Sequence, residues 1–321
     1  MTDAASVIHP DYREWIELIK FTAALPPPTL ESMHANRANT NPMLKPPLES
    51  PAWETRTIPG PVGAPDVEIV IVNAGKRGAP RPAILHTHGG GFLYMHPKDI
   101  VFMLQETAAA LDCVIVSVDY RLAPETQFPG SVEDNYTGLK WLHAHAGELG
   151  ADPARIALMG ESAGGGHAAM LAIAARDRGE VPVIYQALTY PMLDDRTGSS
   201  RAVPPHIGAF LWRAAENKFG WACFLGVPAG SQTVPYGAVP ARVEDLSGLP
   251  PTFIAVGSID LFVEEDIEYA RRLNNAGVPV ELHVYPGCVH AFDALPTDSA
   301  ARFKAALYKA LGNAFSKSSA E

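Results

Sequence analysis

The chain has 321 residues and a formal net charge of −10; it can bury a sizeable core, and without clustered Lys or Arg it is not expected to bind nucleic acid. Its three cysteines are widely spaced and form no CxxC pair, which predicts neither a zinc site nor a disulfide framework and favours the reducing cytoplasm. The N-terminus lacks the pattern of a secretory signal, and the apolar runs are too short and interrupted to cross a membrane.

Residues 1–50 form a helical arm with proline-rich joints in our interpretation. Apolar residues recur at helical spacing from Tyr12 to Ile19, and the following LPPP stops any helix. A second short helix is predicted within 29–43, before another proline-rich stretch.

From residue 52 onward, short β-rich apolar runs alternate with helix-like segments. This alternation predicts an α/β fold with a mainly parallel sheet of about eight strands and helices on both faces. We expect strands at 53–60, 67–75, 82–90, 113–121, 155–160, 185–193, 251–258 and 280–287. We expect helices at 99–112, 132–149, 263–277 and 299–315, and a further helix directly after Ser162.

The alternation breaks between residues 195 and 245. One or two helices are predicted within 207–226, between loop-like segments. An insertion of this kind in a sheet protein is a candidate lid or cap. The alternative is that the insertion is purely structural and does not contact the substrate. We therefore divide the chain into an N-terminal arm at 1–50, a core formed by 51–194 and 246–321, and a cap insertion at 195–245.

The stretch MGESAGGG at 159–166 joins a strand-like run to a helix-like run. A phosphate-binding loop needs Lys after the glycines, and a dinucleotide fingerprint needs Gly where Ser162 stands, so nucleotide binding is disfavoured. GESAG at 160–164 instead fits G-x-S-x-G in the strand–turn–helix context that this motif requires. Small neighbours permit a turn tight enough to expose the Ser162 hydroxyl, which makes Ser162 the candidate nucleophile.

The stretch HTHGGGF at 86–92, where the third expected strand ends, is a second candidate element of the site. Consecutive glycines expose backbone N–H groups, which a tetrahedral oxyanion needs. Gly90 and Gly91 from this loop, together with Ala163 after the serine, are the candidate oxyanion-hole donors. His86 and His88 are conceivable metal ligands, but no convincing third ligand is evident, so no metal is expected and His88 is assigned to fixing the loop.

A nucleophilic serine needs a base, and the base needs an orienting acid. His290 lies in the loop after the last expected strand, and Asp260 follows the preceding strand. The chain order Ser162, Asp260, His290 is the order of the triad in α/β-hydrolases. Glu264 is the alternative acid, although its position about one turn further on is typical of a helix N-terminus.

HGGGF, DYRLAPE at 119–125, GESAGG and the Asp-then-His tail together resemble the bacterial hormone-sensitive-lipase family of carboxylesterases, from about residue 52 to the C-terminus. The resemblance implies an α/β-hydrolase fold, hydrolysis of small-molecule carboxylic esters through an acyl-enzyme, and no cofactor. It also implies a helical cap built from the arm and the insertion, and frequent homodimers. The chain departs from the family at Glu161, where many members have Asp, and at Leu261 and Phe262, where many have Pro-Leu.

Several alternatives stay open at this point. Plant gibberellin receptors resemble the family but lack the catalytic histidine; the presence of His290 favours an enzyme here. Amide, lactone or carbamate hydrolysis and acyl transfer are further possible activities. If the bulky cap residues line a closed pocket, acyl chains of about two to eight carbons should fit, whereas the alternative is that these residues only pack the cap onto the core. The residues concerned are Trp15, Phe21, Phe210, Trp212, Phe219, Trp221 and Phe224.

Overall fold

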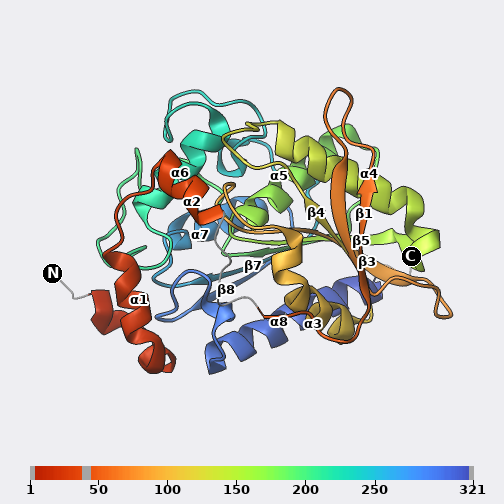
Figure 1. Cartoon of the computed structure of the whole chain (residues 1–321), viewed down its shortest axis with the longest axis horizontal. Coiled ribbons are helices and arrows are strands. Elements are labelled where there is room, and N and C mark those ends of the chain that lie inside the picture. The colour runs from red at the N-terminus through yellow and green to blue at the C-terminus, as the bar shows by residue number, and fades with distance from the viewer. Residues whose placement is uncertain (1–3, 38–44, 318–321) are drawn as a thin grey trace.

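The computed structural model describes residues 4–37 and 45–317, and within them an eight-stranded sheet runs through the centre (Figure 1). Strand β2 is antiparallel to both of its neighbours, and the other pairs are parallel. The predicted fold class and strand count are therefore confirmed. In order across the sheet, the strands are β1 (Trp53–Ile58), β2 (Val67–Val72), β4 (Val114–Asp119), β3 (Arg81–Thr87), β5 (Ala151–Glu161), β6 (Tyr185–Thr189), β7 (Thr252–Gly257) and β8 (Val280–Tyr285).

Helices cover both faces of the sheet, which explains why strands such as β7 are apolar at nearly every position. No helix of the described residues has the length and apolar character needed to cross a bilayer. The α-helices are α1 (Ile16–Ala23), α2 (Leu30–Arg37), α3 (Val101–Leu111), α4 (Gly130–Leu149), α5 (Ala163–Arg178), α6 (Ala214–Leu225), α7 (Val263–Asn275) and α8 (Asp298–Lys317). Short 3₁₀ helices are present at Ala4–Val7, Pro10–Trp15, Pro97–Ile100, Pro240–Arg242 and Phe292–Ala294.

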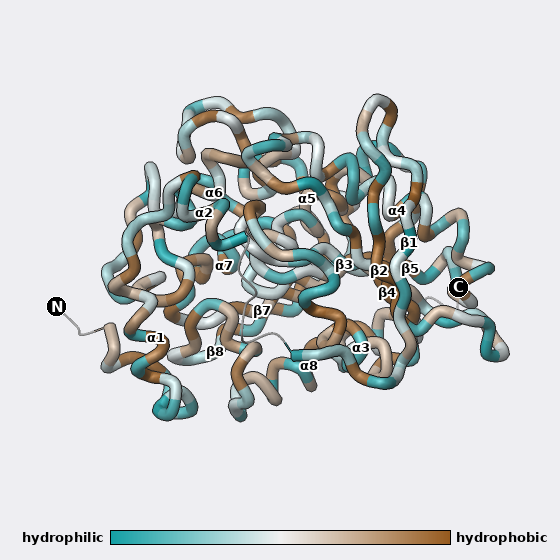
Figure 2. Tube along the Cα trace, viewed as in Figure 1, coloured by the Kyte–Doolittle hydropathy of each residue, from teal (hydrophilic) through white to brown (hydrophobic). Residues whose placement is uncertain are grey.

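The hydrophobic core lies in two layers, one on each face of the sheet. Helices α4, α5 and α7 pack on one face, and α3 and α8 pack on the other. Successive residues of a strand point to opposite faces, so Val114 and Val116 of β4 join the first layer, whereas Ile115 joins the second. Figure 2 shows the apolar residues concentrated along the central strands, as expected for a sheet buried on both faces.

The N-terminal arm and the insertion meet at one end of the molecule, where α1, α2 and α6 gather (Figure 1). The backbone N–H of Leu211 donates to Thr22 Oγ1 at 2.8 Å. Arg213 Nη1 donates to the carbonyl oxygens of Ala23 and Leu25 at 2.9 and 2.8 Å. Two segments that lie almost 200 residues apart in the sequence are thus held together by side-chain hydrogen bonds to the backbone.

Two helix predictions differ from the structure in their bounds. Of the one or two helices predicted within 207–226, the structure has one, α6, which begins only at Ala214 because Gly208 and Leu211 adopt positive φ angles of 62° and 60°, which a helix does not permit. The predicted N-terminal helix is divided into a 3₁₀ turn and α1. The predicted second arm helix is observed as α2, and the rest of its predicted range up to residue 43 lies outside the described residues.

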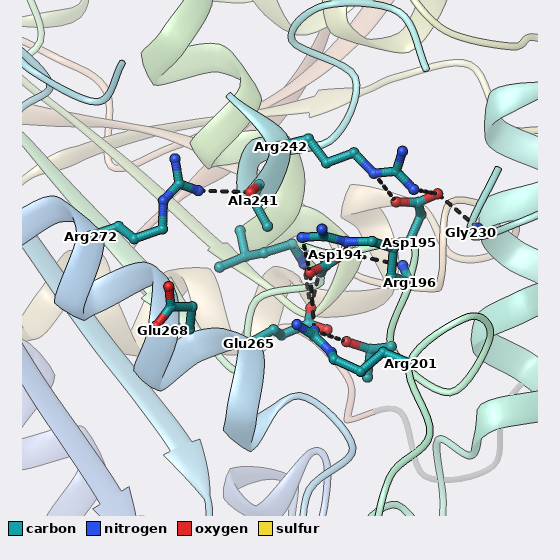
Figure 3. A network of polar contacts seen from close by, with 12 residues as sticks. Asp194, Asp195, Arg196, Arg201, Gly230, Ala241, Arg242, Glu265, Glu268 and Arg272 are labelled. Carbon is teal, nitrogen blue, oxygen red and sulfur yellow. Dashed lines mark hydrogen bonds and ion pairs between the residues drawn. The ribbon is translucent and has the colours of Figure 1, made fainter. Parts of the chain in front are cut away.

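A polar network joins the two ends of the insertion (Figure 3). Asp195 accepts from the Gly230 N–H and from Arg242 Nη2, both at 2.8 Å. Glu265 of α7 accepts from the backbone N–H groups of Leu193 and Asp194 at 2.7 and 3.0 Å. Burial, with a smaller contribution from the nearby negative charge of Asp194, raises the pKa of Glu265 well above its usual value.

Glu265→Gln is expected to change how stability depends on pH. In the unfolded chain Glu265 loses its proton near pH ~4.3, but in the folded protein it keeps the proton to higher pH. Wild-type stability therefore falls as the pH rises above this value, whereas Gln, which can accept the same backbone hydrogen bonds, has no proton to lose. In urea unfolding at pH 5 and pH 8, the variant should gain stability relative to wild type at the higher pH. The same difference at both pH values would contradict the raised pKa.

Candidate active site

Ser162 occupies a strained turn between β5 and α5. Its φ and ψ angles of 57° and −124° lie where non-glycine residues are rare, and such strain is found mostly at functional sites. The turn is fixed from the neighbouring strand, since the Ser162 N–H donates to the Thr189 carbonyl oxygen at 2.9 Å. The Ser162 carbonyl oxygen accepts from the Met192 N–H at 2.9 Å. The side chain is therefore presented at the carboxyl edge of the sheet.

Two glycines let the surrounding backbone approach this turn. A Cβ on Gly164 would lie 2.0 Å from the Thr87 carbonyl oxygen, and a Cβ on Gly160 would lie 2.4 Å from the Gly164 carbonyl oxygen. Neither position can hold a larger residue without moving backbone. The first turn of α5 therefore packs directly against the end of β3.

The structure brings the three predicted triad residues together. His290 Nε2 lies 2.9 Å from Ser162 Oγ, and His290 Nδ1 lies 2.8 Å from Asp260 Oδ2. The other carboxylate oxygen of Asp260 accepts from the Phe262 N–H at 3.0 Å, which fixes its orientation. The alternative acid Glu264 is exposed on α7, whereas Asp260 is only 1% exposed.

Aromatic side chains surround the imidazole of His290. Tyr190 and Phe262 contact it edge to face, at centroid distances of 4.7 and 5.2 Å, and Trp212 lies at 6.3 Å. The Tyr190 hydroxyl donates to Asp293 Oδ1 at 2.6 Å, which holds the phenol ring in place. No motif in the sequence assigns Tyr190, Phe262 or Asp293 to the surroundings of the histidine. For Tyr190, the available signal is its position directly after a strand that neighbours the one carrying the nucleophile.

The glycine-rich loop lies beside the serine. Gly90 and Gly91 have φ angles of 105° and 62°, and a Cβ on Gly90 would lie 2.2 Å from the Tyr94 carbonyl oxygen. The N–H groups of Leu93 and Tyr94 donate back to the Gly90 carbonyl oxygen at 2.9 and 3.0 Å. These bonds fold the loop back on itself, and the two glycines place no side chain at the turn.

His86 and His88 lie just before this loop and make different contacts. His86 Nε2 donates to Glu161 Oε2 at 2.9 Å, and its Nδ1 accepts from the Ser117 hydroxyl at 2.8 Å. His88 stacks on Tyr120 with a centroid distance of 4.1 Å, and burial lowers the pKa of His88 to about 4. Among the residues described, no three His, Cys, Asp or Glu side chains are arranged to hold a metal ion.

A family profile described as the alpha/beta hydrolase fold matches residues 84–294. The chain is 36% identical over 239 residues to the esterase LipI of Mycobacterium tuberculosis, which covers 73% of each chain. It is 35% identical to the carboxylesterase NlhH of the same organism, over 66% of each chain. The solved structure of a bacterial heroin esterase aligns with a TM-score of 0.83 at 34% identity, covering 98% of this chain and 99% of that one.

The chain belongs to the bacterial hormone-sensitive-lipase family. It is a serine carboxylesterase with an α/β-hydrolase fold. Both departures from the family pattern lie at the site of this esterase. Glu161 binds His86, and Phe262 packs against His290 while its N–H orients Asp260.

Gly164→Ala is expected to destabilise this esterase by about 1–3 kcal/mol or more, because the added methyl group would collide with backbone. Gly147→Ala is the matched control, since Gly147 lies inside α4 with open space at its Cβ. The control should gain up to about 1 kcal/mol from the better helix propensity of Ala. Thermal or urea unfolding measures both changes, and equal effects would contradict the described packing of α5 on β3.

Proposed function

We propose that Ser162 is the nucleophile of this carboxylesterase, His290 its general base and Asp260 the acid that orients the base. The supporting observation is the continuous hydrogen-bond chain from the serine hydroxyl through the imidazole to a buried carboxylate. The three side chains are also almost shielded from water, with exposed fractions of 7%, 6% and 1% for Ser162, His290 and Asp260. This shielding strengthens the electrostatic interactions among them.

In the proposed mechanism, Ser162 Oγ attacks the ester carbonyl carbon while His290 Nε2 accepts the hydroxyl proton. The imidazolium then gives this proton to the leaving alkoxide oxygen, so that the alcohol departs and an acyl-serine remains. A water molecule attacks the acyl-serine in the same way and releases the carboxylic acid. Asp260 accepts the Nδ1–H bond throughout, which fixes the tautomer and stabilises the imidazolium.

Gly90, Gly91 and Ala163 are proposed to donate their N–H groups to the oxyanion. In the described part of the chain, none of these three N–H groups donates a hydrogen bond to another residue. Ala163 is the first residue of α5, where the helix dipole adds to the stabilisation of negative charge.

The proposed substrates are small-molecule esters with acyl chains of about two to eight carbons, because an apolar pocket rewards each buried methylene only until it is full. The cap aromatic residues divide into different roles. Trp221 and Phe224 are buried and pack on Phe92 behind the glycine-rich loop, and Phe21 is 63% exposed. Trp212 is the cap residue whose ring lies beside the catalytic histidine.

The proposed division into arm, core and cap insertion is supported by the hydrogen bonds that join the arm to the insertion and by the network that closes the ends of the insertion.

We also propose a cytoplasmic homodimer. The free state of the three cysteines supports the location, and the exposure of Leu282 and Val284 on the edge strand β8 supports a pairing surface. A monomer mass in sedimentation velocity would contradict the dimer.

Ser162→Ala is expected to lower kcat on p-nitrophenyl butyrate by about 10⁴-fold or more, because no other group can form the acyl-enzyme. The fold should be retained, since the substitution removes a single hydroxyl group, and circular dichroism measures this. A variant that keeps more than a tenth of the wild-type kcat would contradict the proposed nucleophile.

Asp260→Asn and Glu264→Gln separate the two candidate acids. Loss of the carboxylate that holds Nδ1–H should lower kcat by about 10²–10⁴-fold in Asp260→Asn. The exposed Glu264 has no contact with the imidazole in this arrangement, so Glu264→Gln should lower kcat by less than about tenfold. Steady-state kinetics on the same ester measures both, and the reverse ranking would move the acid assignment to Glu264.

A further inference from the structure

The indole ring of Trp212 lies directly on the glycine-rich loop. A Cβ on Gly91 would be 2.1 Å from Trp212 Cη2 and 2.8 Å from Cζ2, so the six-membered part of the indole touches the backbone there. The same ring lies 6.3 Å from the imidazole of His290. The half-buried ring of Trp212 therefore lies between a proposed oxyanion donor and the proposed catalytic base.

Trp212 is held in this position from several sides. Its Nε1–H donates to Asn217 Oδ1 at 3.3 Å, and the buried Asn217 in turn donates to the Thr197 carbonyl oxygen at 2.8 Å. The residues on either side of it in the sequence, Leu211 and Arg213, bind the N-terminal arm. A ring fixed at both its backbone and its nitrogen acts as a rigid wall.

The position of the ring indicates which part of the substrate it meets. In the tetrahedral intermediate the oxyanion faces Gly91, and the leaving alcohol oxygen must approach His290 Nε2, which protonates it. A ring that touches Gly91 and lies beside His290 is therefore next to the side of the intermediate that carries these two oxygens. At a tetrahedral carbon the other two substituents, Ser162 Oγ and the acyl chain, point away from the bisector of these two oxygens.

We propose that Trp212 limits the size of the alcohol group that the enzyme accepts. This assignment rests on the proposed function of Ser162, His290 and the glycine-rich loop. It deepens that function by assigning a specificity-determining residue to the leaving-group side of the site.

Trp212→Ala tests the proposal with two matched ester series on the purified full chain. The alcohol series is methyl, butyl and cyclohexyl acetate, and the acyl series is methyl acetate, butyrate and octanoate. For Trp212→Ala we expect the ratio of kcat/KM for cyclohexyl acetate to that for methyl acetate to rise by about tenfold or more, because a wall next to the site is removed. The ratio of methyl octanoate to methyl acetate should stay within about threefold of wild type. Trp212→Phe should show a smaller rise in the first ratio.

Trp53→Ala is the control, since it makes the same substitution on β1, the edge strand at the opposite end of the sheet from β8. This variant should leave both ratios unchanged. If Trp212→Ala does not fold, Trp212→Leu carries the same test. A rise confined to the acyl series, or equal changes in the kcat/KM values of all five esters, would overturn the proposal. Full activity in Ser162→Ala would instead overturn the proposed function, and this assignment with it.

Discussion

The site depends on one backbone constraint, the strained turn that carries Ser162. A serine with positive φ at the end of a central strand is tolerated because the surrounding backbone holds it, through hydrogen bonds to Thr189 and Met192. The same turn requires the close approach of α5 to β3, which only glycine at position 164 permits. Once this junction is formed, the hydroxyl, the helix N-terminus and the glycine-rich loop lie at one edge of the sheet.

The parallel order of the strands brings the remaining groups to that edge. β5, β6, β7 and β8 lie side by side, so the loops that follow them carry Ser162, Tyr190, Asp260 and His290 to neighbouring positions. Glu161 and Asp293 add carboxylates beside this group, each bound by a ring side chain. The insertion contacts the N-terminal arm through hydrogen bonds of Arg213, and it packs on Phe92 through the aromatic rings of Trp221 and Phe224.

Much of the fold and of the proposed triad could be predicted from the sequence, because those features depend on local patterns. Strand–helix alternation and the glycines around Ser162 leave signatures that do not require knowledge of distant contacts. Features that depend on tertiary packing leave no such local signature. The positive φ of Leu211, the separate roles of Trp212 and Trp221, and the contact between Phe262 and His290 all follow from which segments meet in space.

The most direct test of the account is the site of covalent modification by an active-site phosphonate ester. Intact-mass measurement followed by peptide mapping should find one phosphonyl group per chain, attached to Ser162, with esterase activity lost in proportion to its formation. The Ser162→Ala protein should remain unmodified. A phosphonyl group on another residue, or full loss of activity without modification of Ser162, would contradict the account.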